Sequence, residues 1–153
     1  MIYIGIDPGP DYVAWAYIQE AEGKIWLAHG KEKPENHYVS GFDHVGIEVL
    51  PEYGFMRSPL IRTGYTIGKM MMVYPTIKEI TRIAVRKCLT GRGSHITDAD
   101  IRCALIEIYG DPGKKKNPGP TYGFKRDTWQ ALAVAHTLKM LVENEEVRSE
   151  ITR

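Results

Sequence analysis

The chain has 153 residues, 43% of them hydrophobic and 25% charged, and a formal net charge of +1. This length predicts one domain, residues 1–153, with a sizeable core, and the sequence has neither a cationic leader before an apolar run nor an apolar window long enough to span a membrane. Secreted and membrane classes are therefore excluded, and we expect a cytoplasmic protein. Cys88 and Cys103 have no CxxC partner, which predicts free buried thiols rather than a disulfide or a zinc site.

The small net charge hides a segregation of charge along the chain. Residues 1–56 carry nine acidic side chains against three lysines, whereas residues 57–92 carry eight basic side chains against Glu79 alone. A second basic stretch, residues 111–126, carries five basic side chains against Asp111: Lys114, Lys115, Lys116, Lys125 and Arg126. This asymmetry predicts a polyanion that meets one side of an acidic centre.

The first predicted element is a strand that ends in a carboxylate. Ile2, Ile4 and Ile6 alternate with other residues, and Pro8-Gly9 favours a turn, so Asp7 stands at the carboxyl end of the strand. A carboxylate that closes an apolar strand is costly to desolvate unless something binds it, as a divalent cation would. The alternative is an aspartate that hydrogen-bonds its own turn.

Four further strands are predicted before residue 86. Residues 12–18 and 24–28 complete three antiparallel strands, residues 31–42 form a connection with at most a turn or two of helix, and residues 44–50 form a fourth strand with Glu48 near its end. Residues 78–85 fit a fifth strand. We therefore expect an α/β fold with a five-stranded mixed sheet, in which three antiparallel strands are followed by two parallel ones.

Three helices are predicted around this sheet. The first covers residues 60–74 and contains Gly64 and Gly68, a pair that predicts close approach to the sheet or to a ligand, because each glycine costs a helix up to about 1 kcal/mol. The second begins after Thr97 and ends at Gly110, and an irregular Pro- and Gly-rich loop follows it. The third runs from Asp127 to Glu145.

Three carboxylates stand out at the ends of these elements: Asp7, Glu48 and Asp127. If the first and fourth strands are parallel neighbours, about 4.8 Å apart, Asp7 and Glu48 can share a cation. Asp127 is explained equally well as a helix N-cap. Two divalent cations held by such oxygen ligands would activate water and relieve charge on a leaving oxygen, which is what phosphodiester hydrolysis needs. In that scheme Asp7 bridges two ions, Glu48 holds one, and Asp127, assisted by Gln130, holds the other.

Four segments in order resemble the RuvC-type Holliday junction resolvases, in a compact form like those of phages. They are Gly5-Ile6-Asp7-Pro8-Gly9, Gly46-Ile47-Glu48, Gly91-Arg92-Gly93-Ser94, and the run from Asp127 to His136. The resemblance covers nearly the whole chain. It implies an RNase H-like fold, a homodimer in a bacterial or phage-infected cell, and symmetrical nicking of four-way or branched DNA with Mg2+, or Mn2+ in its place, as two ions per site. No nucleotide cofactor is expected.

Carried over by position, Asp7, Glu48 and Asp127 match three of the four acidic metal ligands of the family. Gln130 stands where the fourth carboxylate is usual, and Thr97 or Asp98 where a lysine is common, so we expect Lys87 or Arg92 to contact DNA instead. The other predicted DNA-binding residues are Arg57, the basic residues of 111–126 named above, and the aromatics Tyr53 and Phe55, which follow Glu48 in a turn-prone segment. These two aromatics either probe the junction centre or pack as core or interface residues.

Two other functions are open to this sequence. An RNase H-like domain that has lost one ligand, as Gln130 suggests, would bind branched DNA without cutting it. An actin-like phosphotransferase also begins with a strand and a glycine turn after aspartate, but it needs a second phosphate loop and a longer chain.

Overall fold

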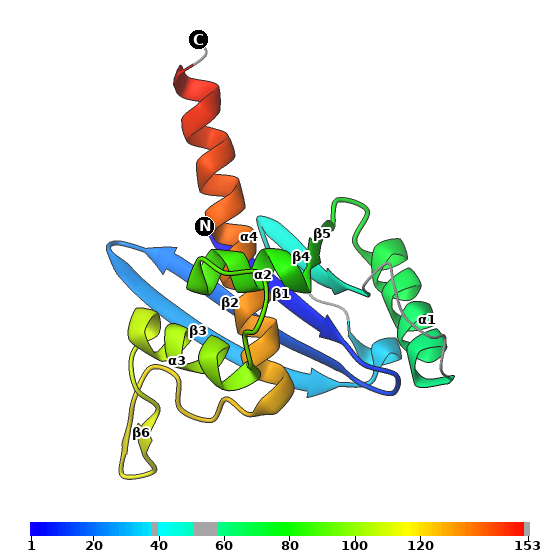
Figure 1. Cartoon of the computed structure of the whole chain (residues 1–153), viewed down its shortest axis with the longest axis horizontal. Coiled ribbons are helices and arrows are strands. Elements are labelled where there is room, and N and C mark those ends of the chain that lie inside the picture. Colours follow the sequence, from blue (N-terminus) through cyan, green and yellow to red (C-terminus); the bar gives the residue numbers. More distant parts are fainter. Residues whose placement is uncertain (38–39, 51–57, 152–153) are drawn as a thin grey trace.

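A five-stranded mixed sheet forms the centre of the molecule, in a computed structural model that describes residues 1–37, 40–50 and 58–151. The strands are β1 (Ile2–Pro8), β2 (Val13–Ala21), β3 (Lys24–Glu32), β4 (His44–Val49) and β5 (Lys78–Thr81). Their order across the sheet is β3-β2-β1-β4-β5 (Figure 1). The first three strands are antiparallel, β4 is parallel to β1, and β5 is parallel to β4. The predicted α/β sheet is confirmed.

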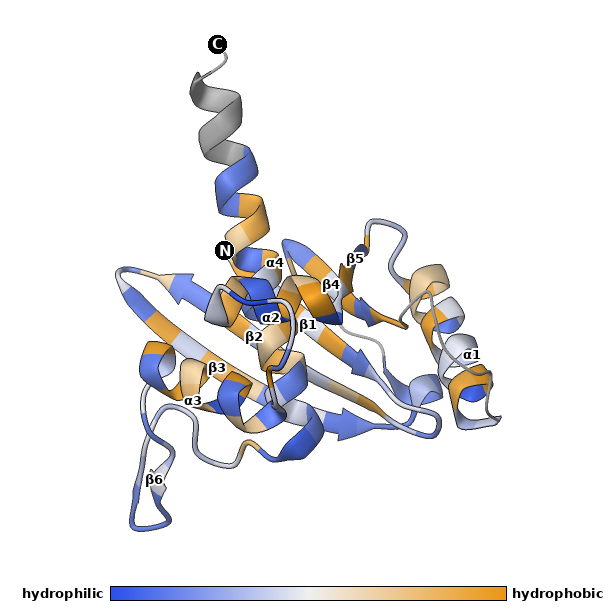
Figure 2. Cartoon of the chain, in the orientation of Figure 1, coloured by the Kyte–Doolittle hydropathy of each residue, from blue (hydrophilic) through white to orange (hydrophobic). Residues whose placement is uncertain are grey.

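The helices cover both faces of this sheet. They are α1 (Ser58–Val73), α2 (Arg82–Thr90), α3 (Asp98–Tyr109) and α4 (Arg126–Ile151), with a short 3-10 turn η1 (Pro34–Asn36) and a small hairpin of β6 (Gly113–Lys114) and β7 (Asn117–Pro118). One hydrophobic cluster joins α2, α3 and α4 to one face, and a second joins α1 to the other. The hydrophobic residues of α4 lie where it crosses the sheet, and it becomes hydrophilic beyond (Figure 2).

The two-residue period of the strands decides which side chains meet α4. On β1, Tyr3 belongs to the cluster under α4, whereas Ile6 belongs to the cluster under α1. Gly5 and Asp7 therefore share the α4 face with Tyr3. Gly5 is paired with Gly46 of β4, and a Cβ at Gly5 would lie 2.2 Å from the carbonyl oxygen of Ala131 on α4. The two glycines let this helix come close to the sheet.

The structure corrects several expectations. Residues 78–85 are not one strand, because Thr81 caps α2 by accepting a hydrogen bond from the Ala84 N–H, and the chain turns into a helix there. Gly64 and Gly68 do not bring α1 close to the sheet, since a Cβ at either would meet nothing within 4 Å among the described residues. The loop after α3 contains the β6–β7 hairpin.

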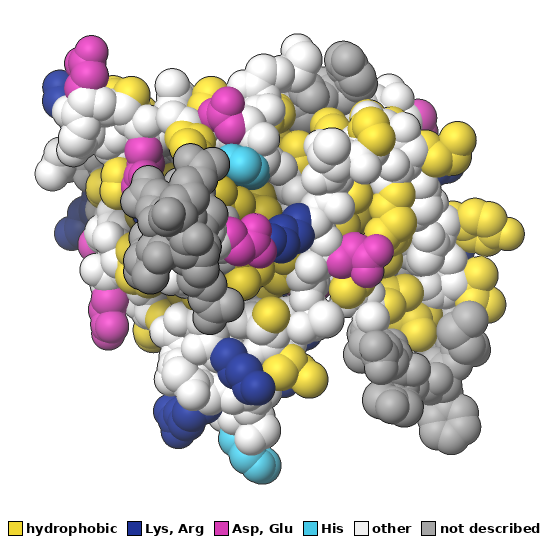
Figure 3. Space-filling model, turned by 90° about the horizontal axis from the view of Figure 1, so that it is seen from above, with side chains coloured by type: hydrophobic (Ala, Val, Ile, Leu, Met, Phe, Trp, Pro, Cys, Tyr) yellow, Lys and Arg dark blue, Asp and Glu magenta, His cyan; other side chains and the backbone are white. Residues whose placement is uncertain are grey.

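The surface also differs from expectation. Both cysteines are free but exposed rather than buried. Large hydrophobic side chains lie exposed on α1, among them Ile61, Tyr65 and Met72, and Figure 3 shows hydrophobic side chains on the side of the molecule where α1 lies. Within the described residues, no helix is both long and apolar enough to cross a membrane.

Candidate functional site

Two strand ends and one helix start meet at the carboxyl edge of the parallel strands. The β1–β4 register pairs Gly5 with Gly46 and Ile6 with Ile47, so Asp7 and Glu48 come next on neighbouring strands, on the face that α4 covers. Asp127 lies in the first turn of α4. Burial raises the pKa of Asp7 to about 7, and the negative charges of Glu48 and Asp127 contribute to the rise. Asp7 therefore interacts electrostatically with both of the other carboxylates.

Glu48 is held by an arginine that the sequence analysis did not place at the site. Nη1 of Arg82, the first residue of α2, donates to both carboxylate oxygens of Glu48, at 3.2 and 3.3 Å. Nη2 of the same guanidinium pairs with Asp98 at the start of α3. Burial raises the pKa of Glu48, and the charge of Arg82 opposes that rise. Glu48 thus faces a fixed positive charge.

Asp127 is held by a lysine from the far edge of the sheet. Asp7 is paired with Ala14 of β2, and Ala14 is paired with Lys31 of β3. The small side chain of Ala14 leaves room between the two, and the Lys31 ammonium forms an ion pair with Asp127. Asp7, Ala14, Lys31 and Asp127 line one small pocket. Each outer carboxylate of the site is therefore paired with a basic side chain.

Gln130 lies one turn after Asp127 and is almost fully buried, with 8% of its surface exposed. Its Oε1 atom has no hydrogen-bond partner among the described residues. A buried amide oxygen without a partner is costly, because nothing replaces the water that it lost. This atom is suited to accept a ligand from outside the chain.

The donor set fits a hard divalent cation. It consists of three carboxylates and one unsatisfied amide oxygen, and such cations prefer oxygen ligands. The mutual repulsion that raises the pKa of Asp7 is the repulsion that a bound cation would relieve. As the side chains stand in the described part of the chain, no three Asp, Glu, His or Cys residues are grouped closely enough to hold an ion. Arg82 and Lys31 hold Glu48 and Asp127 in ion pairs instead.

The predicted DNA-binding residues divide into three groups. Lys125 and Arg126 precede Asp127 and line one groove with it. Lys87 on α2 and Arg92 after it are exposed, as are Lys114, Lys115 and Lys116 on the β6–β7 hairpin, which projects from the body of the molecule (Figure 1). Arg57, Tyr53 and Phe55 lie outside the described residues.

Sequence reasoning missed Lys31 and Arg82, although signals for both are present. Thr81 before the apolar positions of residues 82–90, with Gly91 after them, is a helix start and stop pattern, and it puts Arg82 at a helix start directly after a strand. Lys31 was assigned to a connection, but β3 continues to Glu32. Only the strand register shows that Lys31 lies in line with Asp7.

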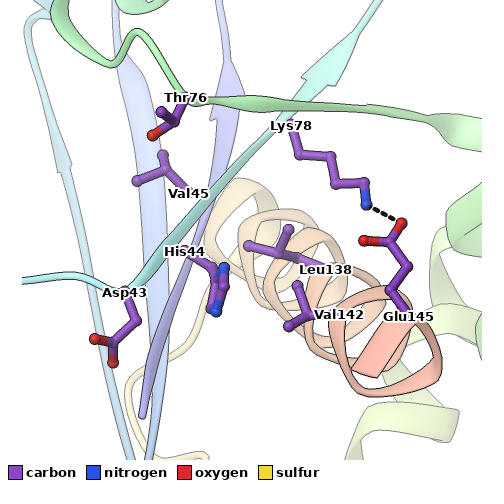
Figure 4. Close-up of a pocket in the computed structure, with 8 residues that line it drawn as sticks. All are labelled: Asp43, His44, Val45, Thr76, Lys78, Leu138, Val142 and Glu145. Carbon is purple, nitrogen blue, oxygen red and sulfur yellow. Dashed lines mark hydrogen bonds and ion pairs between the residues drawn. The ribbon is translucent and has the colours of Figure 1, made fainter. Parts of the chain in front are cut away.

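A separate hollow lies at the opposite end of the parallel strands. Figure 4 shows Lys78 and Glu145 joined by an ion pair beside the starts of β4 and β5. The other carboxylate in this hollow, Asp43, accepts a hydrogen bond from the Ile2 N–H at 2.6 Å. Since both carboxylates among its described lining residues are already paired, this hollow offers no free carboxylate comparable with Asp7.

The raised pKa of Asp7 predicts a pH dependence of stability. Folded Asp7 has a pKa of about 7 against an ordinary value of 3.8, so the stability it contributes is fully present below about pH 4 and is lost as pH rises through 7. Because one pKa unit corresponds to about 1.4 kcal/mol, Asp7→Asn should become more stable than wild type by several kcal/mol on going from pH 4 to pH 8. Urea unfolding in metal-free buffer measures this difference.

The difference between wild type and Asp7→Asn cancels the titrating groups that do not interact with Asp7. His136, whose pKa burial lowers to about 4, is present in both and drops out of the difference. An unfolding difference that does not change with pH would mean that Asp7 ionises as an ordinary exposed carboxylate does.

The chain matches no protein-family model and no curated protein sequence. Among solved structures, it is similar to RuvC of Thermus thermophilus, with 16% sequence identity and a TM-score of 0.66 over 95% of this chain and 97% of that one. It is also similar to T. thermophilus RuvC in complex with a Holliday junction substrate, with 16% identity and a TM-score of 0.64 over 90% of this chain and 92% of that one. The protein therefore has the RNase H-like fold of RuvC.

Proposed function

We propose that this protein is a divalent-cation-dependent endonuclease that resolves four-way or branched DNA by hydrolysing phosphodiester bonds. The observation that carries this proposal is the meeting of Asp7, Glu48 and Asp127 at one edge of a sheet with the RuvC fold. A fold alone does not determine function, so the proposal depends on these three carboxylates and on Asp7, for which the described residues provide no ion pair of its own.

The roles of the site residues follow from their positions. Asp7, buried between the other two carboxylates, is the central ligand, and Asp127 and Gln130, one turn apart on α4, approach it from the helix. A bound Mg2+ or Mn2+ ion would lower the pKa of a water ligand and neutralise charge on the leaving oxygen. The chain's own part is to hold the ligand oxygens in place on β1, β4 and α4.

A nucleic acid substrate is supported by the charge around this edge. The groove that Asp127 lines, between α3, β3 and the segment before α4, also contains Lys31, Arg102, Lys125 and Arg126. Arg102 lies over the ring of Trp129, 5.4 Å from its centre, which keeps the guanidinium at the wall of the groove. Phosphates bind such surfaces through charge. The Holliday junction in the second similar structure supports a branched substrate.

A homodimer is supported by the outer face of α1. Ile61, Gly64, Tyr65, Gly68 and Met72 follow helical spacing along one side, and the exposed fractions of Ile61, Tyr65 and Met72 are 45%, 72% and 87%. No atom of the described residues would lie within 4 Å of a Cβ at either glycine. Small residues among exposed apolar ones let a second helix approach closely, so we propose that two copies pair through α1.

The experiment that tests the function compares substrates. The purified chain is incubated with a synthetic four-way junction or a linear duplex of the same length, with Mg2+ or with EDTA. We expect paired nicks near the junction centre that need Mg2+, and little cutting of the duplex. Tight junction binding without any nick would favour a non-cleaving DNA-binding protein, the second candidate, which the neutral Gln130 favours.

The lysines of the β6–β7 hairpin provide a test of where DNA lies. Reversing the charge of Lys114, Lys115 and Lys116 to Glu should weaken binding to every junction sequence and reduce the slope of log affinity against log salt by roughly two to three, because each lysine that contacts a phosphate contributes almost one unit. Fluorescence anisotropy at several salt concentrations measures the slope. An unchanged slope would show that the hairpin points away from DNA.

A further inference from the structure

Two basic side chains flank Asp7, one toward each of the other carboxylates. Lys31 pairs with Asp127 on one side, and Arg82 pairs with Glu48 on the other. The positive charges of both lower the pKa of Asp7, so both lie within electrostatic reach of it. These are the two places, on either side of a central aspartate, where a pair of metal ions is expected from the sequence.

The two basic side chains differ in how firmly they are held. Lys31 comes from the edge strand β3 and its side chain is 48% exposed. Among the described residues it pairs with one carboxylate and lies over the ring of Tyr12, 5.5 Å from its centre. The side chain of Arg82 is 29% exposed, and its guanidinium joins three elements, because Nη1 donates to Glu48 on β4 and Nη2 pairs with Asp98 on α3. A cation approaching from solvent displaces Lys31 more easily than Arg82.

The net charge of the site also favours the retention of Arg82 when a cation binds. Asp7, Glu48 and Asp127 carry three negative charges when ionised, and Gln130 adds none. Arg82 is paired with Glu48, and the fourth carboxylate, Asp98, lies on the exposed outer side of the same guanidinium. Asp7 and Asp127 are then the two negative charges that one divalent cation balances. A second cation on the Glu48 side would lie against the Arg82 guanidinium and be repelled by it.

We propose that Arg82 takes the place of a cation on the Glu48 side, so that the site holds one divalent ion, between Asp7 and Asp127 with Gln130 beside it. This inference rests on the proposed metal site of the nuclease. Lys31 leaves Asp127 when the ion binds, and Arg82 remains on Glu48 as the permanent positive charge of that side. The two ions per site expected from the sequence are replaced by one ion and one guanidinium.

The test counts ions on the protein without DNA. Mn2+ is titrated into the whole chain by calorimetry up to the millimolar range, and electron paramagnetic resonance shows whether two bound Mn2+ ions are coupled. Wild type should bind one Mn2+ per chain without coupling. Arg82→Gln, which keeps a hydrogen-bond donor for Glu48 but loses the charge, should bind two coupled ions. Arg82→Lys, which keeps the charge, should bind one.

Two further variants serve as controls. Lys31→Ala should bind one ion at least about tenfold more tightly than wild type, because the competing charge is gone. Arg62→Gln removes a surface guanidinium that pairs with Asp11, and should behave as wild type.

The possible results distinguish a failure of the Arg82 inference from a failure of the proposed nuclease function. Two coupled ions in wild type, or a single ion in folded Arg82→Gln, would overturn the role of Arg82 and leave the nuclease intact. No Mn2+ binding by wild type would overturn the proposed metal site and this inference together. If Arg82→Gln does not fold, the counts in wild type and Arg82→Lys decide.

Discussion

Asp7→Asn is expected to reduce cleavage of a four-way junction by about a thousandfold or more while its affinity for the junction changes by no more than a few fold. In the proposed site the carboxylate of Asp7 lies between the other two, so its loss would remove the central oxygen ligand of the cation that the proposed reaction needs. A loss of about 4 kcal/mol of transition-state stabilisation corresponds to this factor. Binding persists because the phosphate contacts are made by basic residues elsewhere.

Single-turnover cleavage and anisotropy binding measure the two effects separately. Asp11→Asn is the matched control, since Asp11 is an exposed carboxylate near the same edge that pairs with Arg62, and its loss should leave cleavage within a few fold. Glu48→Gln should behave as Asp7→Asn does, and Gln130→Asp should keep activity or raise metal affinity. If Asp7→Asn loses binding and cleavage in parallel, Asp7 contributes to DNA binding or folding and not to the chemistry.

Gly5→Ala is expected to destabilise the fold by about 3 kcal/mol or more, because the added methyl group has no room. A Cβ at this position would lie 2.2 Å from the carbonyl oxygen of Ala131, 2.3 Å from the nitrogen of Ala135 and 2.9 Å from its Cα. All three atoms belong to the backbone of α4, so the whole helix must shift. The shift would move Asp127 and Gln130 away from Asp7 as well.

Two other glycines give a graded comparison in urea unfolding. At Gly46 a Cβ would meet the end of the Ile80 side chain at 2.9 Å and Leu138 at 3.3 Å, and because side chains yield more easily than backbone, we expect a loss of about 1–2 kcal/mol. At Gly64 it would meet no atom of the described residues within 4 Å, and Gly64→Ala should gain up to about 1 kcal/mol of helix stability. Equal stabilities for the Gly5 and Gly64 variants would mean that α4 does not pack tightly on β1.

The sequence by itself determined the elements whose signals are local. The alternation of Ile2, Ile4 and Ile6 predicts β1 with Asp7 at its end, and similar local patterns predict the other strands that form three antiparallel and two parallel members of the sheet. Thr97 predicts the start of α3, where a capping box forms with Asp100. These features depend on periods and end signals that lie within a few residues of one another.

Only the tertiary structure decided the contacts between distant segments. Gly5 and Gly46 carry no local sign that a helix 80 or more residues later crosses them, and Gly64 and Gly68, which do carry the pattern of close packing, face open space. Arg82 reaches Glu48 because β5 ends at Thr81, earlier than the sequence predicted. Lys31 reaches Asp127 because β3 continues to Glu32. Side chains from β3, β4, α2 and α4 meet there only through strand register and helix placement. The local sequence identifies the carboxylates, but it does not identify the basic residues that pair with them, because those residues are distant in the sequence and are brought close only by the fold.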